Sequence, residues 1–216
     1  MFSELGILSQ RKVFVEATRS TLVGEFVGQT AIKTKNVIDS ALGGVLFIDE
    51  AYSLCNTFDE KRQDFGPECI STLIKEMEDQ RGNLCVILAG YKKEMEELIN
   101  SNTGFKSRIQ FFIDFPNYTE TEMNLIFERM VQNEGFLLDS SCREVVIDYF
   151  KYEINNSENF SNGRLARNLF EKVKFEQASR VKKEGSSLDL ITNEDIVNVT
   201  EKIKSKSKKR FIGFSA

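Results

Sequence analysis

Short apolar runs alternate with helix-period segments along the first half of the chain, and this alternation limits the possible folds most strongly. The runs are bounded by turn signals and lie at Val13–Val15, Val45–Ile48, Leu84–Leu88 and Ile109–Phe115. Such an order predicts β-α-β units, an α/β fold and a parallel sheet. The second and third runs are continuously apolar rather than alternating, which indicates strands buried on both faces, with helices on either side of the sheet.

The pattern changes after Pro116, because only helical periodicity follows it. The sequence Thr119-x-x-Glu122 is typical of a helix start, and further helices are expected at about 140–153, 163–183 and 193–203. We therefore predict an α/β domain over 1–116 and a small helical domain over 117–203.

A basic tail is predicted over 204–216. The stretch from Lys202 to Arg210 holds six cations in nine residues. A solvated, disordered tail is the preferred interpretation, and contact with an acidic partner or a nucleic acid is the alternative.

Composition excludes several classes of function. The chain has 216 residues, a net charge of -4 and no histidine. Without histidine, neither a Ser-His-Asp triad nor a histidine-ligated metal site can form, and the four cysteines are too scattered for a zinc set. The small net charge creates no overall positive field, so the sequence does not point to a nucleic-acid partner. It also contains no apolar run long enough to span a membrane and no signal-peptide pattern. We expect a cytoplasmic protein with no membrane partner.

The sharpest local signal is the run Gly43–Ala51, in which four apolar residues lead directly into Asp49 and Glu50. Ligands of open α/β sheets bind at the carboxyl ends of the strands. An aspartate there can hold Mg²⁺ directly or through water, and the neighbouring glutamate can polarise a water for attack on a γ-phosphate. The alternative is a strand that simply ends in an acidic loop.

Several ordered motifs around this run resemble one family. They are Leu22–Ala31, Lys33–Lys35, Gly43–Leu54, Asp64–Glu68, Val86–Tyr91 and Phe160–Asn168. Together they resemble the AAA+ ATPase group that contains stage V sporulation protein K and the red-type (CbbX-like) rubisco activases, and the likeness runs from Leu5 to about Arg180. It implies a P-loop NTPase-like parallel sheet followed by a helical lid, ATP and Mg²⁺ as cofactors, a hexameric ring, and a protein substrate that is remodelled or threaded.

The resemblance also implies roles for residues of the α/β domain. Asp49 would assist Mg²⁺, and Glu50 would activate the hydrolytic water. Tyr91 stands at the sensor-1 place, where asparagine or threonine is commoner, and a tyrosine that only caps a strand is the alternative. Arg108 matches the arginine finger that a neighbouring subunit receives, and a surface cation is the alternative.

Three further residues are matched by the same resemblance. Arg167 matches the sensor-2 arginine of the lid, with Arg164 one turn earlier, although two solvated helix arginines would look the same. Phe26, between Gly24 and Gly28, matches the pore-loop aromatic that grips a polypeptide. The alternative for Phe26 is a turn with one buried aromatic ring.

The phosphate-binding P-loop is missing from these residues, since none of the 13 glycines is followed by lysine. In the family's order the P-loop and its strand would precede Met1, and that strand lies mid-sheet in the order 5-1-4-3-2. Its absence would separate the strand expected over 109–115 from that over 84–88. We expect poor stability, aggregation, or repacking that pairs these two strands.

Three functions remain open at this point. The first is a sporulation protein K type ATPase, active in its full-length form. The second is a non-catalytic remnant or regulatory module that binds proteins but cannot bind ATP alone. The third is a red-type rubisco activase.

Overall fold

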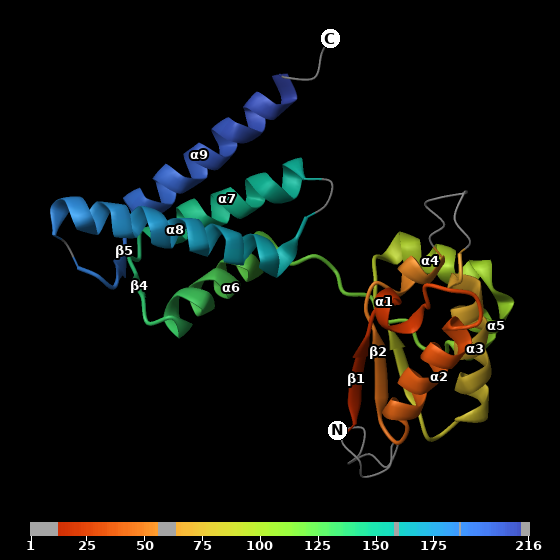
Figure 1. Cartoon of the computed structure of the whole chain (residues 1–216). Coiled ribbons are helices and arrows are strands. Elements are labelled where there is room, and N and C mark those ends of the chain that lie inside the picture. The colour runs from red at the N-terminus through yellow and green to blue at the C-terminus, as the bar shows by residue number, and fades with distance from the viewer. Residues whose placement is uncertain (1–12, 56–63, 158–159, 186, 213–216) are drawn as a thin grey trace. The chain divides into compact units, whose positions relative to one another are not determined.

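The computed structural model describes residues 13–55, 64–157, 160–185 and 187–212, with side chains up to residue 205. The chain divides into two compact units, Met1–Asp114 and Phe115–Ala216. Each unit has its own buried apolar cluster. Figure 1 labels their helices and strands.

The first unit is built on a three-stranded parallel sheet with the order β1-β2-β3. Its strands are β1 (Phe14–Ala17), β2 (Val45–Ile48) and β3 (Cys85–Leu88). Ala17 lies beside Ile48, and Ile48 lies beside Leu88, so the three carboxyl ends are level. A level edge brings the residues that follow each strand into one place.

The helices of this unit follow the strands as the sequence pattern predicts. They are α1 (Arg19–Leu22), α2 (Thr30–Ala41), the 3₁₀ turn η1 (Ala51–Cys55), α3 (Gly66–Asp79), α4 (Lys92–Ser101) and α5 (Thr103–Arg108). Figure 1 shows α2 and α3 side by side against the sheet. Leu46 and Ile48 are fully buried in the cluster that these helices form with the sheet.

The opposite face of the sheet is less covered than the sequence suggested. Phe14 is 57% exposed, and its ring stacks on half-buried Phe47 with centroids 6.0 Å apart. Cys85 and Ile87 of β3 are half-buried. Within the described residues, burial of the strands on both faces is therefore only partly realised.

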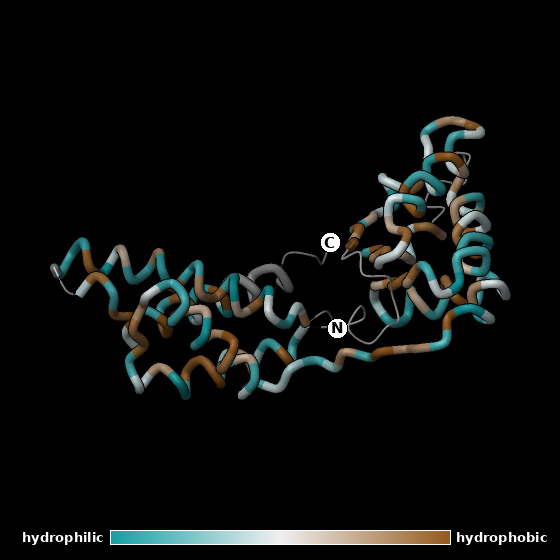
Figure 2. The backbone as a smooth tube through the Cα atoms, turned by 90° about the horizontal axis from the view of Figure 1, so that it is seen from below, coloured by the Kyte–Doolittle hydropathy of each residue, from teal (hydrophilic) through white to brown (hydrophobic). Residues whose placement is uncertain are grey.

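The strand predicted over 109–115 is wrong. Residues 109–119 form neither helix nor strand, and Phe111, Phe112, Ile113 and Phe115 are 69–87% exposed. Figure 2 shows hydrophobic residues along the extended segment that joins the two units. This segment has apolar β-type composition, but a strand needs a neighbour to which its backbone can hydrogen-bond. In the described residues β3 ends the sheet. Repacking that pairs this segment with β3, one of the three outcomes expected from the sequence, is therefore not formed there.

The second unit is helical. Its elements are α6 (Glu120–Asn133), β4 (Leu137–Leu138), α7 (Cys142–Asn156), α8 (Asn162–Glu184), β5 (Leu190–Ile191) and α9 (Asn193–Ile212). Phe170 on α8 makes edge-to-face contacts with Phe127 and Phe136, with ring centroids about 6 Å apart. The two short strands pair in parallel.

Two local predictions for this unit have clear outcomes. The capping box at Thr119 is confirmed, because Thr119 N donates to the Glu122 carboxylate and Glu122 N donates back to the Thr119 hydroxyl. The prediction that the basic tail is disordered from residue 204 is wrong, because α9 continues to Ile212. Lysine and arginine are good helix formers, so a charged sequence alone does not end a helix.

Candidate functional site

Asp49 and Glu50 lie at the carboxyl end of the central strand β2. Asp49 N donates to Ala17 O at 3.0 Å, and Ala51 N donates to Ala89 O at 2.9 Å, so both neighbouring strands hold this segment. Glu50 lies between these two anchors, and its φ of 49° is unusual for a residue other than glycine. The Asp49 carboxylate accepts a hydrogen bond from Glu50 N at 3.0 Å.

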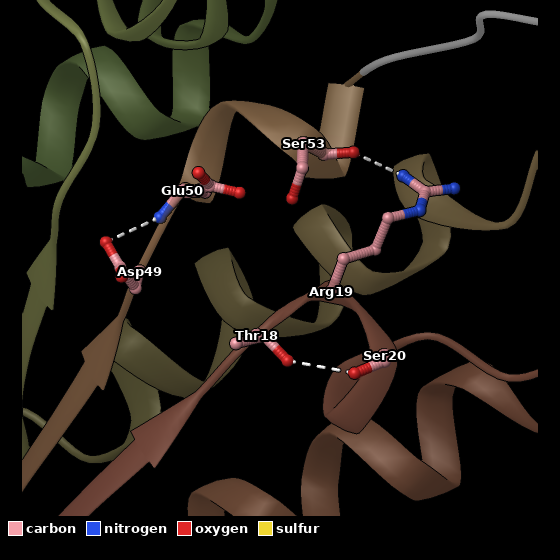
Figure 3. Close-up of a pocket in the computed structure, with 6 residues that line it drawn as sticks. All are labelled: Thr18, Arg19, Ser20, Asp49, Glu50 and Ser53. Atoms are coloured by element: carbon pink, nitrogen blue, oxygen red, sulfur yellow. Dashed lines mark hydrogen bonds between the residues drawn. The ribbon is translucent and has the colours of Figure 1, made fainter.

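These two acids line a cavity of about 300 Å³, which we call the acid pocket. Its other lining residues follow β1 or belong to η1: Thr18, Arg19, Ser20 and Ser53. Figure 3 shows the Glu50 carboxylate and the Ser53 hydroxyl directed toward the same space. The pocket therefore offers carboxylates, hydroxyls and one guanidinium at the edge where ligands of parallel sheets bind.

Arg19 connects three segments at one side of the acid pocket. Its Nη1 donates to Ser53 O at 2.5 Å, and its Nη2 donates to Asp64 Oδ1 at 2.6 Å. Sequence reasoning missed this residue. Its place directly after β1, level with the acids after β2, is the signal that could have found it.

Tyr91 caps the amino end of α4 and is 63% exposed. Its ring lies 6.0 Å from that of Tyr52, which belongs to η1. Partial burial and the nearby Glu50 carboxylate raise the pKa of the Tyr52 hydroxyl above its ordinary value. Tyr91 therefore lies next to Tyr52, and Tyr52 in turn lies near Glu50. Tyr52 is a second residue that sequence reasoning did not single out.

Phe26 is exposed at a turn beyond α1. Phe26 and Val27 are 66% and 74% exposed, which excludes the alternative of a buried ring. The turn is held at its base, because Lys33 Nζ donates to Ser20 O at 2.7 Å and to Val23 O at 3.0 Å. The chain thus presents two apolar side chains on a supported tip.

Arg108 ends α5 and is not among the residues of the acid pocket. Its Nε lies 3.3 Å from the Glu78 carboxylate, near the end of α3. Since α3 begins at Gly66, beside the Arg19–Asp64 pair, Glu78 lies about 18 Å along the helix from that pair. The structure does not bring Arg108 to Asp49 and Glu50 of the same chain.

Arg164 and Arg167 lie in the first turns of α8 and are exposed. Both belong to the second unit, whereas the acid pocket belongs wholly to the first. They share one stretch of helix surface, because residues three apart face the same way.

The donor set of the acid pocket suits a hard divalent cation. Magnesium prefers oxygen ligands and is usually held by one or two carboxylates, with water completing its shell. Asp49 and Glu50 supply the carboxylates, and the hydroxyls of Thr18, Ser20 and Ser53 add polar lining. Within the described part of the chain, no group of three or more His, Cys, Asp or Glu side chains is placed to hold a metal ion.

A parallel sheet with paired acids at its carboxyl edge, followed by a helical unit, is the arrangement found in α/β nucleotide-binding proteins with a helical lid. Residues 2–117 match the "ATPase family associated with various cellular activities (AAA)", and residues 119–207 match the "AAA lid domain". The chain belongs to the AAA ATPase family, as the sequence motifs indicated.

Relatives narrow this assignment to one group. Stage V sporulation protein K of Bacillus subtilis is 41% identical over 84% of this chain and 56% of its own length. Protein CfxQ of Xanthobacter flavus is 40% identical over 83% and 56%, and the chloroplastic rubisco activase of Cyanidioschyzon merolae is 38% identical over 82% and 61%. The chain therefore spans somewhat more than half the length of these relatives.

Solved structures show the same fold at low sequence identity. A mutant RuvB of Thermotoga maritima matches with a TM-score of 0.61 and 16% identity, over 93% of this chain and 55% of its own. The AAA domain of FIGL-1 matches with a TM-score of 0.60 and 12% identity, over 86% and 60%. The predicted α/β fold with a helical lid is confirmed.

Among the described helices, none combines the length and apolarity needed to cross a bilayer.

Proposed function

We propose that this chain belongs to an ATPase module that works in an oligomeric ring and remodels or threads a protein substrate. The observation that carries this proposal is the acid pocket, which places Asp49 and Glu50 side by side at the carboxyl end of β2. The family assignment supports nucleotide hydrolysis in general, and the pocket supplies residues for that chemistry.

The two acids take different roles in this proposal. Asp49, which also accepts the Glu50 amide, holds Mg²⁺ directly or through water. Glu50 points into the pocket, where its carboxylate orients a water molecule and accepts its proton during attack on the γ-phosphate. A bound Mg²⁺ supplies neutralising charge to the phosphate oxygens.

Arg108 acts on the pocket of a neighbouring subunit. Its separation from the acids of its own chain favours this role over one within the same chain, since a finger must reach the transferred phosphoryl group. A residue donated across an interface requires at least two subunits, and head-to-tail packing that closes gives a ring.

The remaining predicted site residues serve nucleotide sensing and substrate contact. Arg164 and Arg167 present two cations from the lid, and Tyr91 connects β3 to the acids through Tyr52. Phe26, together with Val27, forms the exposed apolar tip that contacts a polypeptide. The chloroplastic rubisco activase among the relatives makes rubisco one candidate substrate, which is the alternative of a red-type rubisco activase.

A second candidate function is a protein-binding module that does not turn over ATP. Within these 216 residues none of the 13 glycines is followed by the lysine of a P-loop, so the acid pocket described here does not include that phosphate ligand. The exposed tip at Phe26 would serve either function. The two candidates differ in whether the acid pocket is used.

The test is a chimaera in which a strand, a phosphate-binding loop of the G-x-x-x-x-G-K-[ST] type and a helix precede this chain. Glu50→Gln should retain ATP while kcat falls at least about 100-fold, because a general base is lost. Arg108→Ala should lose turnover and retain nucleotide, and Arg81→Ala, an exposed arginine at the end of α3, is the control.

Mixing the two variants sharpens the test. Subunits carrying Glu50→Gln still donate Arg108 to neighbours, so mixed rings should recover part of the activity that each variant lacks. Loss of ATP binding by both variants would contradict these roles. A wild-type chimaera that binds ATP without hydrolysing it would favour the second candidate.

A further inference from the structure

We propose that Arg19 is a positioning residue that fixes the location of the Glu50 carboxylate in the acid pocket by holding η1 against the start of α3. The inference rests on the proposed function, because it assigns Arg19 to the catalytic geometry of that site. Among the described residues, Arg19 forms no ion pair with Asp49 or Glu50, so it acts on Glu50 through the backbone of η1.

The contacts of Arg19 reach Glu50 through one closed turn. Ser53 N donates to Glu50 O at 2.8 Å, so residues 50–53 form a single hydrogen-bonded turn. Arg19 Nη1 donates to the carbonyl oxygen of Ser53 at 2.5 Å. Holding that carbonyl therefore holds the turn whose first residue is Glu50. Figure 3 shows the bond from Arg19 to Ser53, with Glu50 on the same segment.

The backbone of Glu50 needs such support. A φ of 49° lies in the left-handed region, which residues with a Cβ adopt rarely. Conformations of this kind persist when the surrounding structure determines them. The sheet does so before and after Glu50 through Asp49 N and Ala51 N, and Arg19 does so at the far end of the turn.

Asp64 fixes the second branch of the guanidinium. Its side chain is only 10% exposed, and its Oδ1 accepts hydrogen bonds from Arg19 Nη2 at 2.6 Å and from Gly66 N at 2.9 Å. Arg19 thus joins η1 to the residues that begin α3. A planar fork with two separate donors can make both contacts at once.

The close packing around Gly66 shows that this junction tolerates little movement. A Cβ at Gly66 would lie 2.0 Å from the carbonyl oxygen of Leu54 and 3.2 Å from Arg19 Nη1. The start of α3 therefore touches the backbone of η1 directly. A lysine at position 19 could reach the carbonyl or the carboxylate but would lack the fork that links them.

The first readout uses the chain itself and measures amide hydrogen exchange. Arg19→Lys should speed exchange of the Ala51–Cys55 amides by about tenfold or more, because charge-assisted bonds that hold the turn are lost. Asp64→Asn should change the same amides in the same direction, and Arg81→Lys should leave them at the wild-type rate. Unchanged exchange in Arg19→Lys would overturn the inference, whether or not ATP is hydrolysed.

The second readout uses the ATPase chimaera and separates positioning from a merely structural role. Arg19→Lys should lower kcat about tenfold with KM for ATP changed less than about twofold, because only the placement of the base is disturbed. In a Glu50→Gln background the same substitution should have no further effect on kcat. A raised KM with unchanged kcat, or fully additive losses, would overturn the inference.

The two readouts also separate this inference from the proposed function. A wild-type chimaera without ATPase activity removes the proposed function, and the exchange data then decide the Arg19 contact alone. An active wild type with Arg19→Lys equally active retains the proposed function and removes the inference.

Discussion

The pair Arg180–Asp195 lies inside the second unit and determines how its last two helices are joined. The side chains are 12% and 1% exposed. Asp195 accepts hydrogen bonds from Arg180 Nε at 2.9 Å and Nη2 at 3.0 Å. It also accepts from the amide and hydroxyl of Thr192, at 2.9 and 3.0 Å, at the start of α9.

Asp195→Asn keeps the shape of this side chain and removes its charge. The mostly buried guanidinium of Arg180 then loses the charge of its closest carboxylate, and the new side-chain amide points a donor at another donor. Breaking a buried pair by removing one partner costs about 3–5 kcal/mol. We expect the free energy of unfolding of the second unit to fall by about 3 kcal/mol, the lower end of that range.

Urea unfolding followed by circular dichroism, with hydrogen exchange to assign the transition to α8 and α9, measures this loss. Glu201→Gln is the matched control, because Glu201 lies on the same helix, is exposed and loses the same charge. The control should stay within about 0.5 kcal/mol of wild type. A loss below about 1 kcal/mol for Asp195→Asn would refute the reasoning from burial.

The same pair predicts a dependence on pH. Burial opposes ionisation of Asp195, but the bonds from Arg180 and Thr192 outweigh it and hold the pKa of this carboxyl below its usual 3.8. A lowered pKa stabilises the fold above the unfolded value and loses that effect as pH falls through the folded value. The second unit should therefore weaken below about pH 4, and Asp195→Asn should flatten this part of the profile.

Two other substitutions test the first unit. Gly90→Ala should cost about 1–3 kcal/mol in urea unfolding, because its Cβ would lie 2.7 Å from Tyr52 Cδ1 and 2.8 Å from Met95 Sδ. Gly163→Ala is its control, since nothing lies within 4 Å of the added carbon, and a loss of equal size there would contradict the packing argument. Phe26→Ala should leave stability within about 0.5 kcal/mol and basal ATPase activity of the chimaera unchanged. It should abolish substrate remodelling, and an unaltered remodelling rate would remove Phe26 from the substrate-contact role.

Features encoded by neighbouring residues could be predicted from the sequence. The strand Val45–Ile48 and its terminal acids form one local pattern, and the capping box needs only Thr119 and Glu122. The end of α9 was missed for a local reason as well, since a lysine-rich segment is compatible with both tail and helix.

Features that depend on distant partners could not be predicted in the same way. Arg19 gains its role from Ser53 and Asp64, which lie 34 and 45 residues further along the chain. The segment 109–115 has the composition of a strand, yet a strand exists only with a neighbour beside it. Both outcomes depend on which hydrogen-bonding groups from distant parts of the chain meet in space. The periodicity of a sequence carries no such information.

The exposed residues Phe111, Phe112, Ile113 and Phe115 also bear on how long the chain survives in a cell. Chaperones and proteases continuously sort proteins by the apolar surface they display, so small differences in such display change abundance several-fold. Four exposed apolar side chains in one segment, in a chain whose described sheet also ends at the edge strand β3, mark it for such capture. The cellular half-life of the protein therefore depends on the exposure of these four side chains, independently of the acid pocket.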